Sequence, residues 1–153
     1  MVRGLSHMTF IVRDLDRTEA MLVAVLGARR VYDSGDETFS TSRERFFLVG
    51  GEPGDPDAPA PIWIAIMEGE ALPARTYNHV AFKIEEADVE RCRAAIGALG
   101  LDIREGRPRV EGEGRSIYFY DHDGHLFELH TGTLAERLAR YAGGRRVPGR
   151  TGG

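Results

Sequence analysis

Two histidines and one glutamate at separated places in the chain could bind a metal ion together. His7 and His79 each open a strand-like segment, and Glu128 stands between Phe127 and Leu129 in a third such segment. A carboxylate in so apolar a run needs a counter-charge, because an unpaired buried charge is costly. Two imidazoles and one carboxylate form a facial triad, which leaves about three coordination positions open on a divalent transition metal. We therefore predict a metal site at His7, His79 and Glu128.

A simpler interpretation of the same residues is also open. Both histidines could be strand residues whose nitrogens bond backbone groups, and Glu128 could pair with an arginine. The spacing alone does not decide between the two, because the three residues do not form a local motif. Three other histidines flank a turn or end a strand, and we expect them to be surface or hydrogen-bonding residues: His122, His125 and His130.

The two candidate histidines occupy equivalent positions of an internal repeat. The segment "HMTFIVRDLDRTEAMLVAVLGA" from His7 matches "HVAFKIEEADVERCRAAIGALG" from His79 in its pattern. In each segment a strand leads into a helix with an apolar stripe, and each helix stops near a glycine, Gly27 or Gly100. Glycine takes the left-handed conformation that ends a helix most easily. The repeat favours the metal site, because it explains why both histidines open their segments.

Side-chain alternation indicates which way these residues point. Along the first strand, His7 and Thr9 share one face, while Met8, Phe10 and Val12 share the other and are predicted to be core. His79 is expected to behave in the same way in its own half. On the last strand, Glu128 lies on a face with Leu126 and His130. A two-fold relation between the halves would bring the two histidines together near Glu128.

Short β-type runs follow each helix, and they suggest the same order of elements in both halves. They are "RRVYD", "ETFST", "RFFLVG" and "PIWIAIM" in the first half, then "LDIRE", "RSIYFYD" and "HLFELH" in the second. Each half is predicted to be a strand, a helix and about three strands, which makes an α+β protein with helices covering the outside of curved sheets. We place one domain at 1–142, with repeats at about 4–68 and 76–132, a C-terminal helix at about 133–142, and a disordered tail at 143–153.

Capping pairs and prolines mark the limits of some elements. A capping pair joins an N-cap side chain to an acid three residues later, and two such pairs predict helix starts at Asp16 with Glu19 and at Thr133 with Glu136. The segment 51–61 contains four prolines and two glycines, so it cannot be a strand. We expect a surface loop there.

Composition limits the classes of function. The chain has 153 residues, 42% of them apolar and 29% charged, which is typical of a single globular domain. A net charge of −4 gives no basic excess for nucleic acid. No apolar run approaches the roughly 18 residues of a membrane span, and no signal pattern opens the chain, so we expect a cytoplasmic protein. The lone cysteine, Cys92, falls at helical spacing with Val89 and Ile96, which favours simple packing.

A paired βαβββ unit with a histidine on the first strand of each half and a glutamate on the last resembles the vicinal oxygen chelate superfamily, which includes glyoxalase I and the extradiol dioxygenases. Several blocks are more narrowly similar to the fosfomycin-resistance proteins of the hydrolytic type, which open the drug's epoxide with water. These blocks are "GLSHMTFIVRDL", "TSRERFFLVG", "YNHVAFKI", "RPRVEGEGRSIYFYD" and "FELHTGTLAERLAR". The proline-rich loop and the tail are not matched.

The resemblance implies an assembly and a metal. It implies cup-like mixed sheets and a domain-swapped homodimer, in which His7 of one subunit joins His79 and Glu128 of the other. It also implies manganese(II) as the preferred ion and fosfomycin as the small phosphonate epoxide substrate. The spacing of the residues indicates neither the assembly nor the ion.

The resemblance also assigns roles to single residues. Glu44 corresponds to the glutamate that hydrolytic relatives use as a general base; without the resemblance, it would be a strand-entry glutamate paired with Arg43 or Arg45. Five further residues match positions that contact phosphonate: Thr9, Ser116, Tyr118, Arg137 and Arg109. Arginine suits phosphonate oxygens because its donors are arranged as a fork. Without the family, each of these arginines would be a solvated surface charge.

Three other functions remain open on this scaffold. A thiol transferase would open the epoxide with glutathione or bacillithiol, and Glu44 argues against it because it supplies a base for water. An extradiol dioxygenase could use the same three ligands with iron(II). A drug-binding protein of this fold would sequester fosfomycin without consuming it, and such binders usually lack the metal triad.

Overall fold

The structure is a computed structural model of the chain that describes residues 1–51, 59–104 and 114–143. The first half holds β1 (His7–Val12), α1 (Leu15–Leu26), β2 (Arg29–Asp33), β3 (Glu44–Val49) and β4 (Ile62–Glu68). The second half holds β5 (His79–Lys83), a short 3-10 turn η1 (Glu86–Asp88), α2 (Val89–Ala98), β6 (Asp102–Arg104), β7 (Ser116–Tyr120) and β8 (Leu126–His130), and α3 (Leu134–Gly143) follows. The predicted order of strand, helix and three strands is therefore confirmed in both halves.

Each half forms one mixed sheet of four strands. The N-terminal sheet has the order β1-β4-β3-β2, and the C-terminal sheet has the order β5-β8-β7-β6. In each sheet the first strand of the half pairs in parallel with the last, and the other pairs are antiparallel. The two sheets are thus copies of one arrangement, as the sequence repeat indicates, and the α+β prediction is confirmed.

One predicted strand is wrong. The run "ETFST", residues 37–41, forms bends rather than a strand. The chain turns just before it, where Gly35 adopts a left-handed φ of 61°. Phe39 is the one large apolar side chain of the run and is 69% exposed, so a strand there would have no face to bury.

The helix ends follow local chemistry, with one correction. The N-cap of α1 is Asp14, whose Oδ1 accepts a hydrogen bond of 3.0 Å from the backbone N–H of Arg17. The predicted start at Asp16 with Glu19 is therefore wrong, because Glu19 is used instead in ion pairs with Arg30 and Arg45. The helix stop at Gly27, with φ of 65°, is confirmed.

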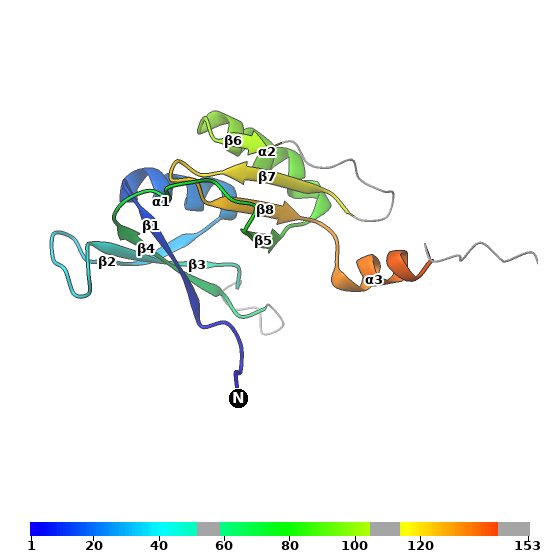
Figure 1. Cartoon of the computed structure of the whole chain (residues 1–153), viewed down its shortest axis with the longest axis horizontal. Helices are drawn as coiled ribbons and strands as arrows, with labels where there is room; N and C mark the ends of the chain where they lie inside the picture. The colour runs from blue at the N-terminus through cyan, green and yellow to red at the C-terminus, as the bar shows by residue number, and fades with distance from the viewer. Residues whose placement is uncertain (52–58, 105–113, 144–153) are drawn as a thin grey trace, which may run out of the picture.

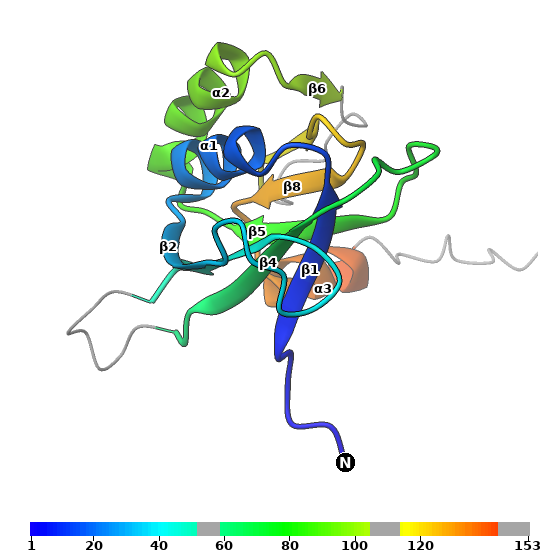
Figure 2. The same ribbon diagram turned by 90° about the vertical axis from the view of Figure 1, so that its left-hand side faces the viewer.

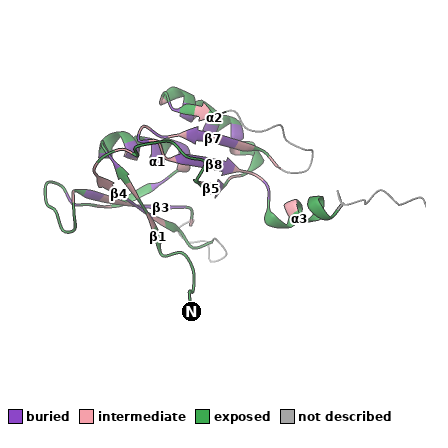
Figure 3. Ribbon diagram, viewed as in Figure 1, coloured by how far each residue is buried: buried purple, intermediate pink, exposed green. Residues whose placement is uncertain are grey.

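The capping pair of α3 is confirmed as well. The backbone N–H of Glu136 donates to Thr133 Oγ1 at 3.2 Å, and the backbone N–H of Thr133 donates to Glu136 Oε2 at 2.6 Å. This helix begins four residues after the end of β8 and lies apart from both sheets in Figure 1. Most of its surface is exposed, whereas β7 and β8 are largely buried (Figure 3).

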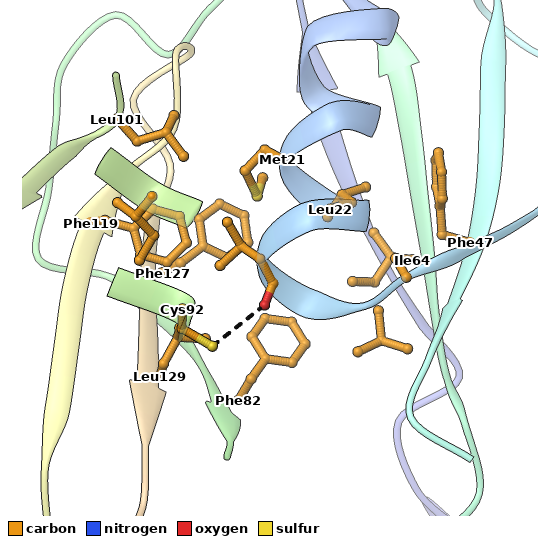
Figure 4. Packing of buried hydrophobic residues seen from close by; sticks show 14 of the residues in the cluster. Met21, Leu22, Phe47, Ile64, Phe82, Cys92, Leu101, Phe119, Phe127 and Leu129 are labelled. Carbon is orange, nitrogen blue, oxygen red and sulfur yellow. Dashed lines mark hydrogen bonds between the residues drawn. The ribbon is translucent and has the colours of Figure 1, made fainter. Parts of the chain in front are cut away.

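The hydrophobic core lies between the two sheets and is filled by α1 and α2. The two helices contact each other, α1 packs on β3 and β4, and α2 packs on β6 and β7, so they lie side by side in both views (Figures 1 and 2). Figure 4 shows Met21 and Leu22 of α1 between residues of the two sheets. Cys92 is fully buried, with its Sγ 3.8 Å from the carbonyl oxygen of Val25, which confirms its predicted packing role.

This arrangement leaves one face of each sheet without a helix. In the N-terminal sheet, Val12, Phe47 and Ile64 are buried toward the helices, while His7 and Thr9 point the other way and are exposed. We call these helix-free surfaces the open faces of the two sheets. Among the described residues, no helix is long and apolar enough to cross a membrane.

The two halves are joined by a buried carboxylate. Arg13, just after β1, donates from Nε to Asp123 Oδ1 at 2.7 Å, and its Nη2 donates to the carbonyl oxygen of His122 at 2.6 Å. Asp123 is 4% exposed and lies in the turn between β7 and β8. This pair holds the end of β1 against the last hairpin.

Candidate metal centre

Two of the three predicted ligands meet on the open face of the C-terminal sheet. His79 opens β5, Glu128 lies on the adjacent strand β8, and His79 Nε2 is 3.1 Å from Glu128 Oε2. Glu128 is 5% exposed and lies between two core residues of the strand, Phe127 and Leu129. Its side chain still points to the open face, because side chains alternate along a strand and those of Phe127 and Leu129 point to the helices.

The hydrogen bonds of His79 prepare its Nε2 for a cation. Its Nδ1 is 2.8 Å from the carbonyl oxygen of Tyr77, which can only accept, so Nδ1 carries a proton. Nε2 of the neutral ring is then an acceptor that faces the acceptor oxygen of Glu128. Two acceptor atoms 3.1 Å apart repel each other unless a proton or a cation lies between them. A metal-binding histidine is held in the same way, with one nitrogen bonded to a carbonyl and the other turned to the ion.

Glu128 is held ionised by its neighbours. Burial opposes its charge, but hydrogen bonds from Ser116 and Tyr118, together with the charges of His130 and His79, lower its pKa below the ordinary value. Ser116 Oγ is 2.5 Å from Glu128 Oε1. Register explains the contact, since β7 runs antiparallel to β8 with Tyr118 opposite Glu128 and Ser116 opposite His130. An ionised, oriented carboxylate beside an imidazole nitrogen is a donor set that fits a divalent transition metal.

His7 does not join this pair within one chain. Among residues 1–51, 59–104 and 114–143, no group of three or more His, Cys, Asp or Glu side chains is close enough to hold one ion. His7 lies on the open face of the N-terminal sheet, with its ring 4.3 Å from the ring of Trp63. A single chain therefore presents two of the predicted ligands on one sheet and the third on the other.

Glu44 lies on the same open face as His7. The register aligns His7 with Trp63 and Leu48, and four residues further along it aligns Ile11 with Met67 and Glu44. Rows of a sheet that are an even number of residues apart point the same way. Thr9, in the row between them, shares this face, so three of the predicted site residues lie together on the N-terminal sheet.

The carboxylate of Glu44 is not used by the neighbouring arginines. Arg43 pairs with Glu68 at 2.6 Å, and Arg45 pairs with Asp16, Glu19 and Asp33. The interpretation of Glu44 as the partner of Arg43 or Arg45 is therefore wrong. Glu44 is 8% exposed, and its backbone N–H donates to Ser34 Oγ at 3.0 Å. Within the described part of the chain, its carboxylate has no hydrogen-bond donor.

The predicted phosphonate contacts lie in different parts of the chain. Ser116 and Tyr118 lie beside Glu128 on the C-terminal sheet. Burial, together with a hydrogen bond with Tyr77 and one that Tyr118 donates to Glu128, raises the pKa of Tyr118, so its hydroxyl stays protonated. Thr9 lies on the N-terminal sheet, and Arg137 is half-buried in the first turn of α3. Arg109 lies outside the described residues, as do most of the proline-rich loop and the tail beyond Gly143.

The minor histidines have different surroundings. His125 Nδ1 is 2.7 Å from Asp121 Oδ2, which agrees with its predicted hydrogen-bonding role. His130 is more closely tied to the site than the sequence indicated, because its Nδ1 is 2.7 Å from Ser116 Oγ. Burial, as the largest cause, lowers the pKa of His122, which lies in the turn between β7 and β8.

Three further residues of the open faces escaped the sequence reasoning. The indole Nε1 of Trp63 is buried next to His7 and has no hydrogen-bond partner among the described residues. The guanidinium of Arg104 lies over the ring of Tyr77, 4.8 Å from its centroid, and Tyr77 is 5.1 Å from the ring of His79. Trp63 sits in a run of apolar residues, so only the pairing of β4 with β1 reveals its place.

Comparison with known proteins identifies the family. The Glyoxalase/Bleomycin resistance protein/Dioxygenase superfamily matches residues 4–129 of the chain. The chain belongs to this superfamily. Members of the glyoxalase superfamily with named functions include close relatives of this chain, as the resemblance in the sequence predicted.

The relatives point to one branch of the glyoxalase superfamily. A fosfomycin resistance protein FosX from Mesorhizobium japonicum is 61% identical over 144 residues, which cover 94% of this chain and 96% of that protein. A crystal structure of a mutant of FosX from Listeria monocytogenes, complexed with Mn(II) and 1S,2S-dihydroxypropylphosphonic acid, has a TM-score of 0.78 at 50% identity and covers 92% of this chain and 99% of that one. A metallothiol transferase FosB from Shouchella clausii is 38% identical and covers 92% of this chain and 88% of that protein.

Proposed function

We propose that this protein is a metal-dependent hydrolase that adds water to the epoxide of fosfomycin and so confers resistance to the drug. The observation that carries the proposal is the pair of His79 Nε2 and Glu128 Oε2, 3.1 Å apart and flanked by the hydroxyls of Ser116 and Tyr118. This donor set lies in a chain 61% identical to a FosX protein. Metal ligands and oxyanion donors on one face suit a phosphonate epoxide.

The proposed ion is Mn(II), held by His79 and Glu128 together with His7. The Mn(II) complex of the Listeria FosX supports this choice, and imidazole with carboxylate is a donor set that manganese accepts. When bound, the divalent ion supplies a Lewis acid and a template for the phosphonate and epoxide oxygens. The carbonyl of Tyr77 and the hydroxyl of Ser116 keep the two ligands of the C-terminal sheet oriented before any ion arrives.

The proposed site is shared between two copies of the chain. His7 lies on the other sheet from His79 and Glu128, so a complete triad needs the N-terminal sheet of a second copy to face the C-terminal sheet of the first. The same pairing places Glu44 and Thr9 opposite Ser116 and Tyr118. A homodimer of this kind is isologous, so it would hold two equivalent sites.

Glu44 is the proposed general base. Its carboxylate accepts a proton from water as the water oxygen forms a bond to an epoxide carbon and the bond from that carbon to the ring oxygen breaks. The ring oxygen then takes a proton from a solvent water, and Glu44 returns its own proton to solvent. The product is a vicinal diol on the phosphonate chain. The Glu44 carboxylate is available for this proton because Arg43 and Arg45 pair with other carboxylates. A positioned general base contributes about 10²- to 10⁴-fold to such a reaction.

The phosphonate is bound by donors that surround the proposed ion. Ser116 and Tyr118 offer hydroxyls on the C-terminal sheet, and Thr9 offers one on the N-terminal sheet. Arg137 supplies a guanidinium from α3, and Arg109 is proposed to supply another. Charged donors of this kind form short hydrogen bonds with phosphonate oxygens and fix the epoxide relative to the base.

The main rival is a thiol transferase that opens the same epoxide. The FosB relative at 38% identity has that name, but the FosX relative is far more similar to this chain. The position of Glu44 on the same face as His7 also favours water, since a thiolate nucleophile needs no base beside the epoxide. A non-catalytic drug-binding protein would have no use for the oriented pair of His79 and Glu128.

Phosphorus NMR of fosfomycin with the purified protein tests the proposal. With manganese and no thiol, we expect the fosfomycin resonance to be replaced by that of 1,2-dihydroxypropylphosphonic acid. Matched samples with manganese alone, and with added glutathione or bacillithiol, give the background and the thiol reaction. An unchanged spectrum without thiol, followed by turnover when thiol is added, would overturn hydration in favour of the transferase.

A further inference from the structure

The hydroxyl of Ser116 lies between a carboxylate, Glu128, and an imidazole, His130. Its Oγ is 2.5 Å from Glu128 Oε1 and 2.7 Å from His130 Nδ1. Ser116 is on β7, and both partners are on the neighbouring strand β8, on the same open face. These are the hydrogen bonds that the structure gives to this hydroxyl among the described residues.

Only one arrangement of protons satisfies both hydrogen bonds of the Ser116 hydroxyl. A serine hydroxyl has a single proton to donate, and its oxygen can accept from another donor. An ionised carboxylate, the form in which Glu128 would bind a metal, can only accept. The proton of Ser116 therefore goes to Glu128. His130 must then be the donor to the oxygen of Ser116, which requires a proton on its Nδ1.

We propose that His130 is a positioning residue whose Nδ1–H holds the hydroxyl of Ser116 as a hydrogen-bond donor toward the open face. In the metal-free protein the Ser116 hydroxyl donates to Glu128. When substrate is bound, the same hydroxyl donates to a phosphonate oxygen. The proposal deepens the proposed function and rests on it for the second acceptor, while the contact with Glu128 stands by itself.

The direction of the hydrogen bond between His130 and Ser116 decides where the proton of the Ser116 hydroxyl points. If Nδ1 of His130 carried a lone pair instead, it would compete for the proton of Ser116 and turn the hydroxyl toward His130 and away from Glu128. An oxygen lone pair would then face the carboxylate of Glu128 and any phosphonate, and both are anions. A donor fixed in advance costs no reorientation when the anion arrives.

The proton on His130 can be observed directly. A long-range proton–nitrogen correlation spectrum of the metal-free protein reports whether Nδ1 is protonated, and comparison with a His130→Gln variant assigns the resonances. We expect a protonated Nδ1. An unprotonated Nδ1 in the folded protein would overturn the proposal, and this measurement requires neither metal nor substrate.

Substitutions at His130 distinguish the two ring nitrogens. The side-chain amide of Asn places its nitrogen where Nδ1 stands, whereas the amide of Gln reaches the place of Nε2. Binding of 1S,2S-dihydroxypropylphosphonic acid to the manganese-loaded protein, measured by calorimetry, is expected to weaken about 10- to 100-fold in His130→Gln and His130→Phe. We expect His130→Asn to recover most of the loss. A His122→Asn variant, in the turn between β7 and β8, serves as the control and should bind like the unmodified protein.

A double variant tests whether His130 acts through Ser116. In a Ser116→Ala background, His130→Phe is expected to add no further loss of affinity, because the hydroxyl that it orients is gone. Equal losses from His130→Phe with and without Ser116, or equal losses from the Asn and Phe variants, would overturn the proposal. A protein that binds the diol with this pattern but does not hydrate fosfomycin would contradict the proposed function and leave the role of His130 intact.

Discussion

Two carboxylates at the open faces have surroundings that suit different tasks. Glu128 receives hydrogen bonds from Ser116 and Tyr118 and lies 3.1 Å from His79, so its charge is held in one place, as a metal ligand requires. Glu44 is nearly as buried but has no donor to its carboxylate among the described residues. A general base needs such an uncommitted oxygen, because every donor that binds the carboxylate makes it a weaker acceptor for a proton.

The Glu44→Gln variant separates these two tasks. Gln keeps the size of the side chain but cannot take a proton, so hydration of fosfomycin is expected to fall about 10²- to 10⁴-fold. Manganese affinity should stay close to that of the unmodified protein. Phosphorus NMR measures the first quantity and electron paramagnetic resonance of free Mn(II) the second.

Two controls accompany this variant. Glu37→Gln changes an exposed glutamate in the segment between β2 and β3 and is expected to alter neither quantity. His79→Ala removes a proposed ligand and is expected to lose both. Full hydration by Glu44→Gln would remove Glu44 from the role of base.

The third helix shows how much of an element local chemistry can specify. Its capping box joins Thr133 and Glu136 through both backbone and side-chain hydrogen bonds. Its apolar residues are exposed in the single chain, with Leu134 at 72% and Leu138 at 57%. Because little of the helix is packed, its stability depends on the capping box more than that of α1 or α2 does.

The capping box makes α3 sensitive to acid. Hydrogen bonds from the hydroxyl and the backbone N–H of Thr133 lower the pKa of Glu136 below its ordinary value of 4.5. A lowered carboxyl pKa adds stability above the unfolded value, and that stability is lost as the pH falls through the folded pKa. We expect the helix population of α3 to be constant from pH 7 to about 5 and to decline below about 4.5, as measured by carbon chemical shifts.

A Glu136→Gln variant is the matched control for this pH dependence. Gln can complete a capping box but does not titrate in this range. We expect its α3 to keep the same helix population across the acid range. An unchanged acid transition in the variant would show that another group unfolds the helix.

At the scale of the whole molecule, the two halves divide the site between them. In the hydrophobic core, α1 packs against α2 between the two sheets. The two open faces therefore point away from this shared core. The ion pair of Arg13 with Asp123 ties the end of β1 to the last hairpin, which limits how far the halves can move. His7 and the pair of His79 with Glu128 therefore stay on separate surfaces of one chain, and in the proposed site a second copy brings them together.

Mixing two inactive variants tests this shared site. In a mixed dimer of His7→Ala with His79→Ala, one of the two sites receives His7 from the second chain and His79 with Glu128 from the first, so it is intact. Random pairing makes half of the dimers mixed, so about a quarter of the original activity is expected to return. The measurement is hydration by phosphorus NMR after unfolding and refolding the two variants together.

The refolded single variants are the controls for mixing. Each is expected to stay inactive, since every site in its dimers lacks one ligand. No recovery on mixing, in a sample whose mixed dimers are demonstrated by native mass spectrometry, would place all three ligands of a site in one chain.

Several features could be predicted from the sequence because they depend on neighbours along the chain. The repeat, the stop of α1 at Gly27 and the capping box at Thr133 follow from local patterns and backbone geometry. The two wrong predictions also concern local choices. Asp14 and Asp16 are both acceptable caps, and only the ion pairs of Glu19 with distant arginines decide between them. The run 37–41 has strand-like residues but no sheet face to cover.

Only the tertiary structure decided which residues meet. Alternation along a strand indicates the face on which a side chain lies, but the register between strands and the packing of the halves determine its neighbours. The contact of His79 with Glu128, the place of Ser116 between Glu128 and His130, and the position of Trp63 beside His7 all depend on register. The separation of His7 from the other two ligands depends on the core between the sheets, which turns the two open faces away from each other.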